Sequence, residues 1–134
     1  MHKNSVIEIN QKAYKKNLDF LKKIHGKEVI ISSVVKGNAY GHGISHYCPL
    51  AHKYGVRHFS VFSAQEALQV TAALPNHEFT LMIMGQIEND ELAWAIGRDV
   101  EFYVFELDRL QAAIATAKLL GRKARIHVEL ETGM

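Results

Sequence analysis

Strand-like and helix-like segments alternate along this chain, and the alternation limits the folds that it can adopt. Short runs rich in β-branched and aromatic residues have the character of strands at residues 29–35, 58–62, 79–84, 100–105 and 125–131. Helix-like segments lie between the later runs, at residues 63–75, 89–96 and 107–120. The repeat of roughly 20–30 residues is typical of βαβ units. We therefore expect an α/β fold with a parallel sheet, either open and doubly wound or curved into a barrel.

Capping residues predict where two of the helices begin and end. Asn10 is suited to cap a helix that Gly26 then ends. Ser63, with Glu66 three residues later, has the spacing of a capping box, and Pro75 stops the helix that this box opens.

Two stretches fit the alternation less simply. Residues 6–9 have the alternating pattern of a short extra strand before the first helix. Pro49 would interrupt a helix that began directly after Gly43, because proline lacks the backbone N–H. We therefore expect this helix to begin near His46, with Pro49 in its first turn.

Composition is that of a soluble domain with no obvious macromolecular ligand. The chain has 134 residues, 48% of them apolar, and a net charge of +2. A basic cluster near the start has helical spacing and is interpreted as the wet face of a helix (Lys12, Lys15, Lys16, Lys22 and Lys23). We expect no nucleic-acid or membrane partner. The single cysteine, Cys48, and the lack of a signal-peptide pattern predict a cytoplasmic protein.

The segment with the clearest chemistry follows the strand-like run at residues 29–35. Lys36 stands at the carboxyl end of that run, where barrel folds assemble active sites. Burial there would favour the neutral amine that attacks an aldehyde. Glycines at positions 37, 41 and 43 allow close approach to a ligand, and the next helix N-terminus could receive a phosphate. A pyridoxal phosphate site needs these features, although a surface turn with an ordinary exposed lysine has the same sequence pattern.

A resemblance to a known family separates these alternatives. Residues 34–43, Val-Val-Lys-Gly-Asn-Ala-Tyr-Gly-His-Gly, resemble the V-V-K-A-N-A-Y-G-H-G signature of alanine racemases, with Gly37 in place of alanine. Residues 127–134, His-Val-Glu-Leu-Glu-Thr-Gly-Met, resemble the family's H-x-K-x-D-T-G-M segment. The separation of the two motifs also fits the family. The resemblance implies the N-terminal portion of a (β/α)₈ TIM-type barrel, with about five of its eight parallel strands present.

The resemblance also implies a cofactor and roles for two residues. Lys36 would form a Schiff base with pyridoxal 5'-phosphate and, once freed, act as acid and base on one face of the substrate α-carbon. Tyr40 would hydrogen-bond the cofactor phosphate. The second base in the family is a tyrosine in the C-terminal domain of a partner subunit, so the full-length form is expected to be a homodimer. The expected reaction interconverts L-alanine and D-alanine, a small-molecule amino-acid substrate, and supplies D-alanine for the cell wall.

The length of the chain leads to an expectation about its domains. Residues 1–134 would form a single partial domain, and the second barrel half and the C-terminal β domain would be absent. Such a fragment is expected to be inactive alone. Its two unpaired strand edges predict that it dimerises or exchanges segments.

One position departs from the family pattern. Many members have a lysine, often carbamylated, at the third position of H-x-K-x-D-T-G-M, and its negative charge orients an arginine. This sequence has Glu129 there, on the same predicted strand face as His127 and Glu131. Val128 and Leu130 would pack on helices from the other face. Our hypothesis is that Glu129 supplies this supporting carboxylate permanently; the alternative is a carboxylate solvated at an open edge.

Other interpretations concern substrate and chemistry. A different amino-acid racemase or a D-amino-acid lyase of the same fold group would share the lysine segment. A non-catalytic pyridoxal-phosphate-binding protein is another alternative, but such proteins usually lack the Asn-Ala-Tyr-Gly-His-Gly that follows the lysine here. A structural remnant that binds no cofactor is a third alternative. His42 and His46 are four residues apart, but Gly43 and Pro49 disrupt the geometry of a zinc helix, so we expect no metal site. Cys48 is expected to be a buried apolar group.

Overall fold

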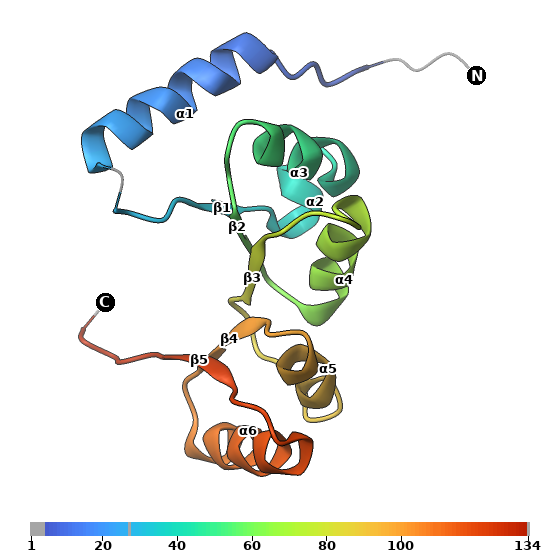
Figure 1. Cartoon of the computed structure of the whole chain (residues 1–134), viewed down its shortest axis with the longest axis vertical. Helices are drawn as coiled ribbons and strands as arrows, with labels where there is room; N and C mark the ends of the chain where they lie inside the picture. Colours follow the sequence, from blue (N-terminus) through green and yellow to red (C-terminus); the bar gives the residue numbers. More distant parts are fainter. Residues whose placement is uncertain (1–4, 27, 134) are drawn as a thin grey trace.

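The computed structural model describes residues 5–26 and 28–133, and within them a single parallel sheet (Figure 1). The strand order is β1-β2-β3-β4-β5, and every neighbouring pair is parallel. The strands are β1 (Ser32–Val34), β2 (His58–Val61), β3 (Thr80–Ile83), β4 (Glu101–Val104) and β5 (Arg125–Val128). The five predicted strands of the parallel sheet are confirmed, each within the range expected from the sequence.

The helices are α1 (Gln11–His25), α2 (Lys36–Tyr40), α3 (Ile44–Lys53), α4 (Ala64–Ala73), α5 (Leu92–Gly97) and α6 (Leu107–Leu120). Helices α2 to α6 connect successive strands, and α1 precedes the first strand. Figure 1 shows α3, α4 and α5 along the same side of the strands, with α6 at the β5 end. A doubly wound sheet would reverse its strand order and have helices on both faces. Sequential order with helices on one side is instead the arrangement of a (β/α)₈ barrel segment.

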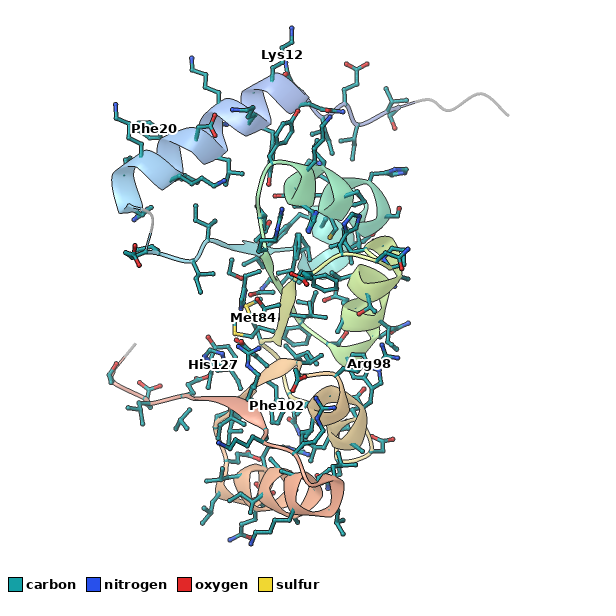
Figure 2. The ribbon with its side chains drawn as sticks, viewed as in Figure 1. Lys12, Phe20, Met84, Arg98, Phe102 and His127 are labelled. Atoms are coloured by element: carbon teal, nitrogen blue, oxygen red, sulfur yellow. The ribbon has the colours of Figure 1, made fainter. Side chains whose placement is uncertain are left out.

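The side of the sheet that faces the helices forms the core. Phe59 and Val61 of β2 and Phe102 and Val104 of β4 are almost completely buried there. Figure 2 shows Phe102 between its strand and the helical layer. Because side chains alternate along a strand, the residues between these positions point to the opposite face. The helical layer and the sheet thus share one apolar core.

The opposite face of the sheet is the one that would point into the interior of a barrel. It has polar and sulfur-containing side chains, among them Ser60, Met82, Met84, Glu101 and His127. Figure 2 shows Met84 and His127 on the side of the sheet away from α4 and α5. Ser60 and Glu101 are nevertheless only 1% and 7% exposed. These two residues are therefore buried polar groups that need hydrogen-bonding partners.

α1 packs at one end of the molecule through a few contacts. Asn10 caps it, since the Asn10 side chain accepts a hydrogen bond from Ala13 N–H at 3.0 Å, as predicted. Leu18 is buried, and the Tyr14 ring lies edge-on to the Tyr47 ring of α3 at a centroid distance of 5.6 Å. Lys22 Nζ donates to the Tyr54 carbonyl at 3.0 Å. None of the helices in the described part of the chain, α1 included, is long and apolar enough to cross a membrane.

The sheet edges differ from their prediction. Residues 6–9 form no strand, and residues 29–31 precede β1 rather than belonging to it. Val29 and Ile30 are 52% and 76% exposed, so the start of the run predicted as a strand at residues 29–35 is not covered. Val128 and Leu130 are also exposed, which contradicts their predicted packing on helices. β1 and β5 are the edge strands of the described sheet, and an edge strand has a neighbour on one side only.

The start of α3 also differs from its prediction. The helix begins at Ile44, and Pro49 lies in its interior rather than in its first turn. The earlier start follows from a side-chain cap: Ile44 N–H donates to Asn38 Oδ1 at 2.9 Å. Pro49 has no N–H to donate to the Ser45 carbonyl, and Ser45 is exposed, so this carbonyl can hydrogen-bond to water.

Candidate functional site

Lys36 lies at the carboxyl end of the parallel sheet. It follows Val35, whose N–H donates to the Ser60 carbonyl of β2 at 2.8 Å and so continues the alignment of β1 with β2. The predicted position at the strand end is confirmed. The predicted burial is wrong, because Lys36 is exposed. Its amine is therefore accessible to a ligand on the described chain.

The four residues after Lys36 form one turn of left-handed backbone. Residues Gly37, Asn38, Ala39 and Tyr40 have φ angles of 60°, 54°, 55° and 53°. A left-handed conformation costs a non-glycine residue roughly 1–2 kcal/mol. Strain of this kind persists only where neighbouring contacts enforce it, and it gathers at functional sites. The turn is labelled α2 in Figure 1.

Hydrogen bonds on both sides hold this turn in place. Ala39 N–H donates to the Val35 carbonyl at 2.8 Å, and Gly41 N–H donates to the Gly37 carbonyl at 3.1 Å. The Asn38 carbonyl accepts from Gly41 N–H at 3.2 Å and from Gly43 N–H at 2.9 Å, and the Asn38 side chain accepts from the first residue of α3. This side-chain contact occupies a donor at the α3 N-terminus. Ile44 N–H is therefore already paired, and the binding of a phosphate at this helix end stays a prediction.

Lys36 and Tyr40 are the first and last residues of α2. Tyr40 is 63% exposed. Both residues are exposed on this one short element. Lys36 offers an amine that can bind an aldehyde, and Tyr40 offers a phenol hydroxyl that can donate to a phosphate oxygen. These side chains fit a phosphate-bearing aldehyde such as pyridoxal phosphate.

Glu129 lies at the other edge of the sheet. It follows β5, is exposed, and its N–H donates to the Val104 carbonyl at 3.1 Å. Lys36 follows β1, so three strands separate the two residues. All five strands are parallel, and both residues therefore lie at the same, carboxyl, end of the sheet without being neighbours in it.

The capping box predicted for Ser63 and Glu66 is confirmed on the Ser63 side, but the Glu66 carboxylate has other partners. Ser63 Oγ accepts a hydrogen bond from Glu66 N–H at 3.3 Å, as the box requires. The Glu66 carboxylate accepts from Phe62 N–H at 2.8 Å and from Gly37 N–H at 2.6 Å. A helix-capping residue thus contacts the lysine segment directly.

Glu101 forms the centre of a polar cluster that the sequence reasoning missed. Its carboxylate pairs with Arg125, accepts from His127 Nε2 at 2.8 Å, and lies 3.4 Å from His58 Nε2. His58 Nδ1 is in turn 2.7 Å from Ser32 Oγ. Burial opposes ionisation of Glu101, but the hydrogen bonds from His127 and His58 and the charge of Arg125 together hold its pKa below the ordinary value.

This lowered pKa leads to a prediction about acid stability. A carboxyl group whose folded pKa is depressed stabilises the fold above its ordinary pKa of 4.5, and the stabilisation is lost as pH falls through the folded value. Glu101→Gln should reduce the free energy of unfolding at pH 7 by about 1–3 kcal/mol. The difference from the natural chain should shrink toward pH 3. Urea unfolding at both pH values tests this, with the exposed Glu78→Gln as control; equal losses at pH 7 and pH 3 would contradict it.

The remaining candidates behave as packing or surface groups. Cys48 is completely buried, and burial raises its pKa to about 12, which keeps it a neutral thiol. His42 and His46 are exposed. Among residues 5–26 and 28–133, no group of three His, Cys, Asp or Glu side chains is arranged to hold a metal ion.

Comparison with known proteins identifies the family to which this chain is similar. Residues 9–134 match the family model described as alanine racemase, N-terminal domain. Alanine racemase 2 of Caldanaerobacter subterraneus subsp. tengcongensis is 32% identical over 130 residues, which make up 96% of this chain and 32% of that protein. The chain thus spans about a third of the length of the curated relatives that it matches.

Solved structures agree with the sequence comparison. The crystal structure of alanine racemase from Oenococcus oeni matches with a TM-score of 0.79 and 26% identity, covering 95% of this chain and 35% of that one. A histidine racemase from Leuconostoc mesenteroides subsp. sake shares the fold, with a TM-score of 0.75, 21% identity and coverage of 87% and 30%. Since the family match extends from residue 9 to residue 134, this chain belongs to the alanine racemase N-terminal domain family.

Proposed function

We propose that the protein containing this chain is a pyridoxal-phosphate-dependent alanine racemase, in which Lys36 is the residue that binds the cofactor. The observation that supports this most is the exposed pair Lys36 and Tyr40, the first and last residues of α2, at the carboxyl end of the sheet. In this proposal the Lys36 amine anchors the cofactor covalently, and Tyr40 donates to its phosphate. When bound, the cofactor supplies an electron sink that acidifies the substrate α-proton.

The proposed proton transfers use one residue of this chain. Released from the cofactor, the Lys36 amine removes or returns the α-proton on one face of the amino acid. A second base must act on the other face, and by resemblance it is a tyrosine from the C-terminal domain of a partner subunit. The active form is therefore proposed to be a homodimer. The present residues would form the first part of its barrel, as one partial domain of a longer cytoplasmic enzyme that makes D-alanine.

The substrate needs its own experiment, because this chain matches part of a histidine racemase in fold as well as part of alanine racemases. The full-length protein should be incubated separately with L-alanine, L-histidine, L-ornithine and L-lysine, and the products separated on a chiral column. We expect D-alanine to form fastest. Faster conversion of another amino acid would assign a different racemase, and loss of amino acid without its enantiomer would indicate a lyase. No conversion by cofactor-loaded protein would refute the enzymatic proposal.

Glu129 is proposed to be the permanent carboxylate that supports the family's arginine. Its support is its position at the carboxyl end of β5, at the same end of the sheet as Lys36. A charge-assisted hydrogen bond is worth about 1.5–3 kcal/mol. Glu129→Gln in the full-length enzyme should therefore lower kcat/KM by roughly tenfold to a hundredfold. Glu129→Asp keeps the charge and should recover part of the activity; unchanged kinetics in Glu129→Gln would show that this carboxylate is only solvated.

A further inference from the structure

We propose that Glu66 is a positioning residue for Lys36, an inference that rests on the proposed function. Glu66 is half-buried at the start of α4, on the strand-to-helix connection after β2. Lys36 is on the connection after β1. The Glu66 carboxylate bridges the two connections through backbone N–H groups, so it acts on the lysine through the main chain.

The bridge is made by the two oxygens of one carboxylate. Oε1 accepts from Gly37 N–H at 2.6 Å, and Oε2 accepts from Phe62 N–H at 2.8 Å. Gly37 is directly bonded to Lys36, so the first contact fixes the peptide unit that follows the lysine. Hydrogen bonds from neutral N–H donors to an ionised carboxylate are short and stronger than neutral pairs. In an ordinary capping box the acid would return to the N–H of its own cap residue, here Ser63.

The left-handed turn explains why the lysine segment needs an outside acceptor. Inside and after the turn, the N–H groups of Ala39, Gly41 and Gly43 donate to carbonyls of the same segment. Gly37 opens the turn, and the acceptor of its N–H is Glu66. This contact therefore holds the first left-handed residue, where the backbone leaves the direction of β1.

The other end of the bridge is anchored in the sheet. The Phe62 carbonyl accepts from Gly85 N–H at 3.0 Å, and the Val61 carbonyl accepts from Met84 N–H at 2.8 Å, which joins the ends of β2 and β3. A Cβ atom at Gly85 would lie 2.5 Å from the Phe62 carbonyl oxygen, so the two chains approach as closely as glycine permits. Glu66 thus connects the Lys36 segment to Phe62, at the point where the end of β2 is hydrogen-bonded to the end of β3.

Removing this carboxylate should disturb the lysine without removing any group that would touch cofactor or substrate. Glu66→Ala leaves Gly37 N–H without its protein acceptor and frees the start of the turn. Misplacement of a reacting group by about 1 Å can lower a rate on the order of a hundredfold. We therefore expect kcat to fall by this order, with a much smaller change in KM, and the cofactor to dissociate about tenfold faster or more.

The test uses the full-length enzyme and three variants, Glu66→Ala, Glu66→Gln and Ser63→Ala. Glu66→Gln retains one acceptor oxygen and should lie between Glu66→Ala and the natural enzyme. Ser63→Ala removes the cap of the same helix but leaves the carboxylate, so it controls for helix destabilisation. Cofactor release is followed by absorbance on dilution, and the cofactor held at Lys36 is quantified by borohydride reduction and peptide mapping. Circular dichroism establishes that each variant is folded.

The outcomes separate the positioning role from the proposed function. Faster cofactor release and lower occupancy of Lys36 in Glu66→Ala, with Ser63→Ala close to the natural enzyme, would support positioning. Equal cofactor release in Glu66→Ala and the natural enzyme would overturn it, as would an equal loss in Ser63→Ala. Both readouts are independent of turnover. Failure of the natural enzyme to racemise alanine while it still holds cofactor at Lys36 would refute only the proposed function.

Discussion

Lys36→Ala in the full-length protein is expected to abolish amino-acid racemisation, with kcat reduced by a factor of about 10⁴ or more. General acid–base catalysis alone contributes about 10²–10⁴ to a rate, and this variant also loses the covalent anchor of the cofactor. Lys36 is exposed at the end of β1, so its removal creates no cavity in the core. The fold should therefore survive the substitution, and the loss should be one of chemistry.

Two controls make this prediction specific. Lys118→Ala removes another exposed lysine, on α6, and should leave the rate unchanged. Addition of a small primary amine to Lys36→Ala should restore part of the activity, because it replaces the missing proton acceptor. The rate is measured as D-alanine formation by chiral chromatography. Activity in Lys36→Ala within tenfold of the natural enzyme would contradict the proposed role.

The second large effect concerns the core between β4 and the helices. Phe102 is completely buried, and Phe102→Ala should lower the free energy of unfolding by about 3–5 kcal/mol, through lost burial and the cavity that remains. Phe20→Ala on α1 is the matched control, since Phe20 is 61% exposed, and it should change stability by at most about 0.5 kcal/mol. Figure 2 labels both residues.

Urea unfolding followed by circular dichroism measures both variants on this chain. The expected result is a large shift of the midpoint for Phe102→Ala and almost none for Phe20→Ala. Similar losses in the two variants would contradict the assignment of the core to the helix-facing side of the sheet.

The interior elements were predictable from sequence because local signals agree with their packing there. The helix at Leu107–Leu120 has its predicted bounds, ended by Gly121 in the left-handed conformation. The strands were located correctly, and the alternation in β2 and β4 matches a face that packs on helices. The edges were not predictable in the same way. Apolar residues such as Ile30 and Val128 have the pattern of a buried strand, but both are exposed in the structure. Burial at an edge depends on what packs against that edge, and local sequence does not encode this.

The site was predictable in its position but only partly in its structure. The lysine segment identified Lys36 and Tyr40, and its glycines indicated an unusual backbone. Asn38 belongs to a residue type that is enriched in the left-handed region, but Ala39 and Tyr40 carry no local signal for it. The contact of Glu66 with Gly37 joins positions 29 residues apart. Periodicity and capping patterns describe local sequence and therefore missed it.

Glu101 shows a signal that could have been used. A carboxylate inside the predicted strand at residues 100–105 is unusual for an apolar segment, and such a charge requires partners when buried. His58, Arg125 and His127 stand at strand positions that face the same side of the sheet. Once the parallel order of strands was assumed, these residues were the available partners.

The central claim is that Lys36 is the amine that holds pyridoxal phosphate. The most direct measurement is borohydride reduction of the full-length protein and its Lys36→Ala variant after mixing with the cofactor, followed by peptide mapping by mass spectrometry. We predict one reduced adduct, on the peptide that contains Lys36, and its loss in the variant. An adduct spread over many lysines, or one that is unchanged in Lys36→Ala, would contradict the claim.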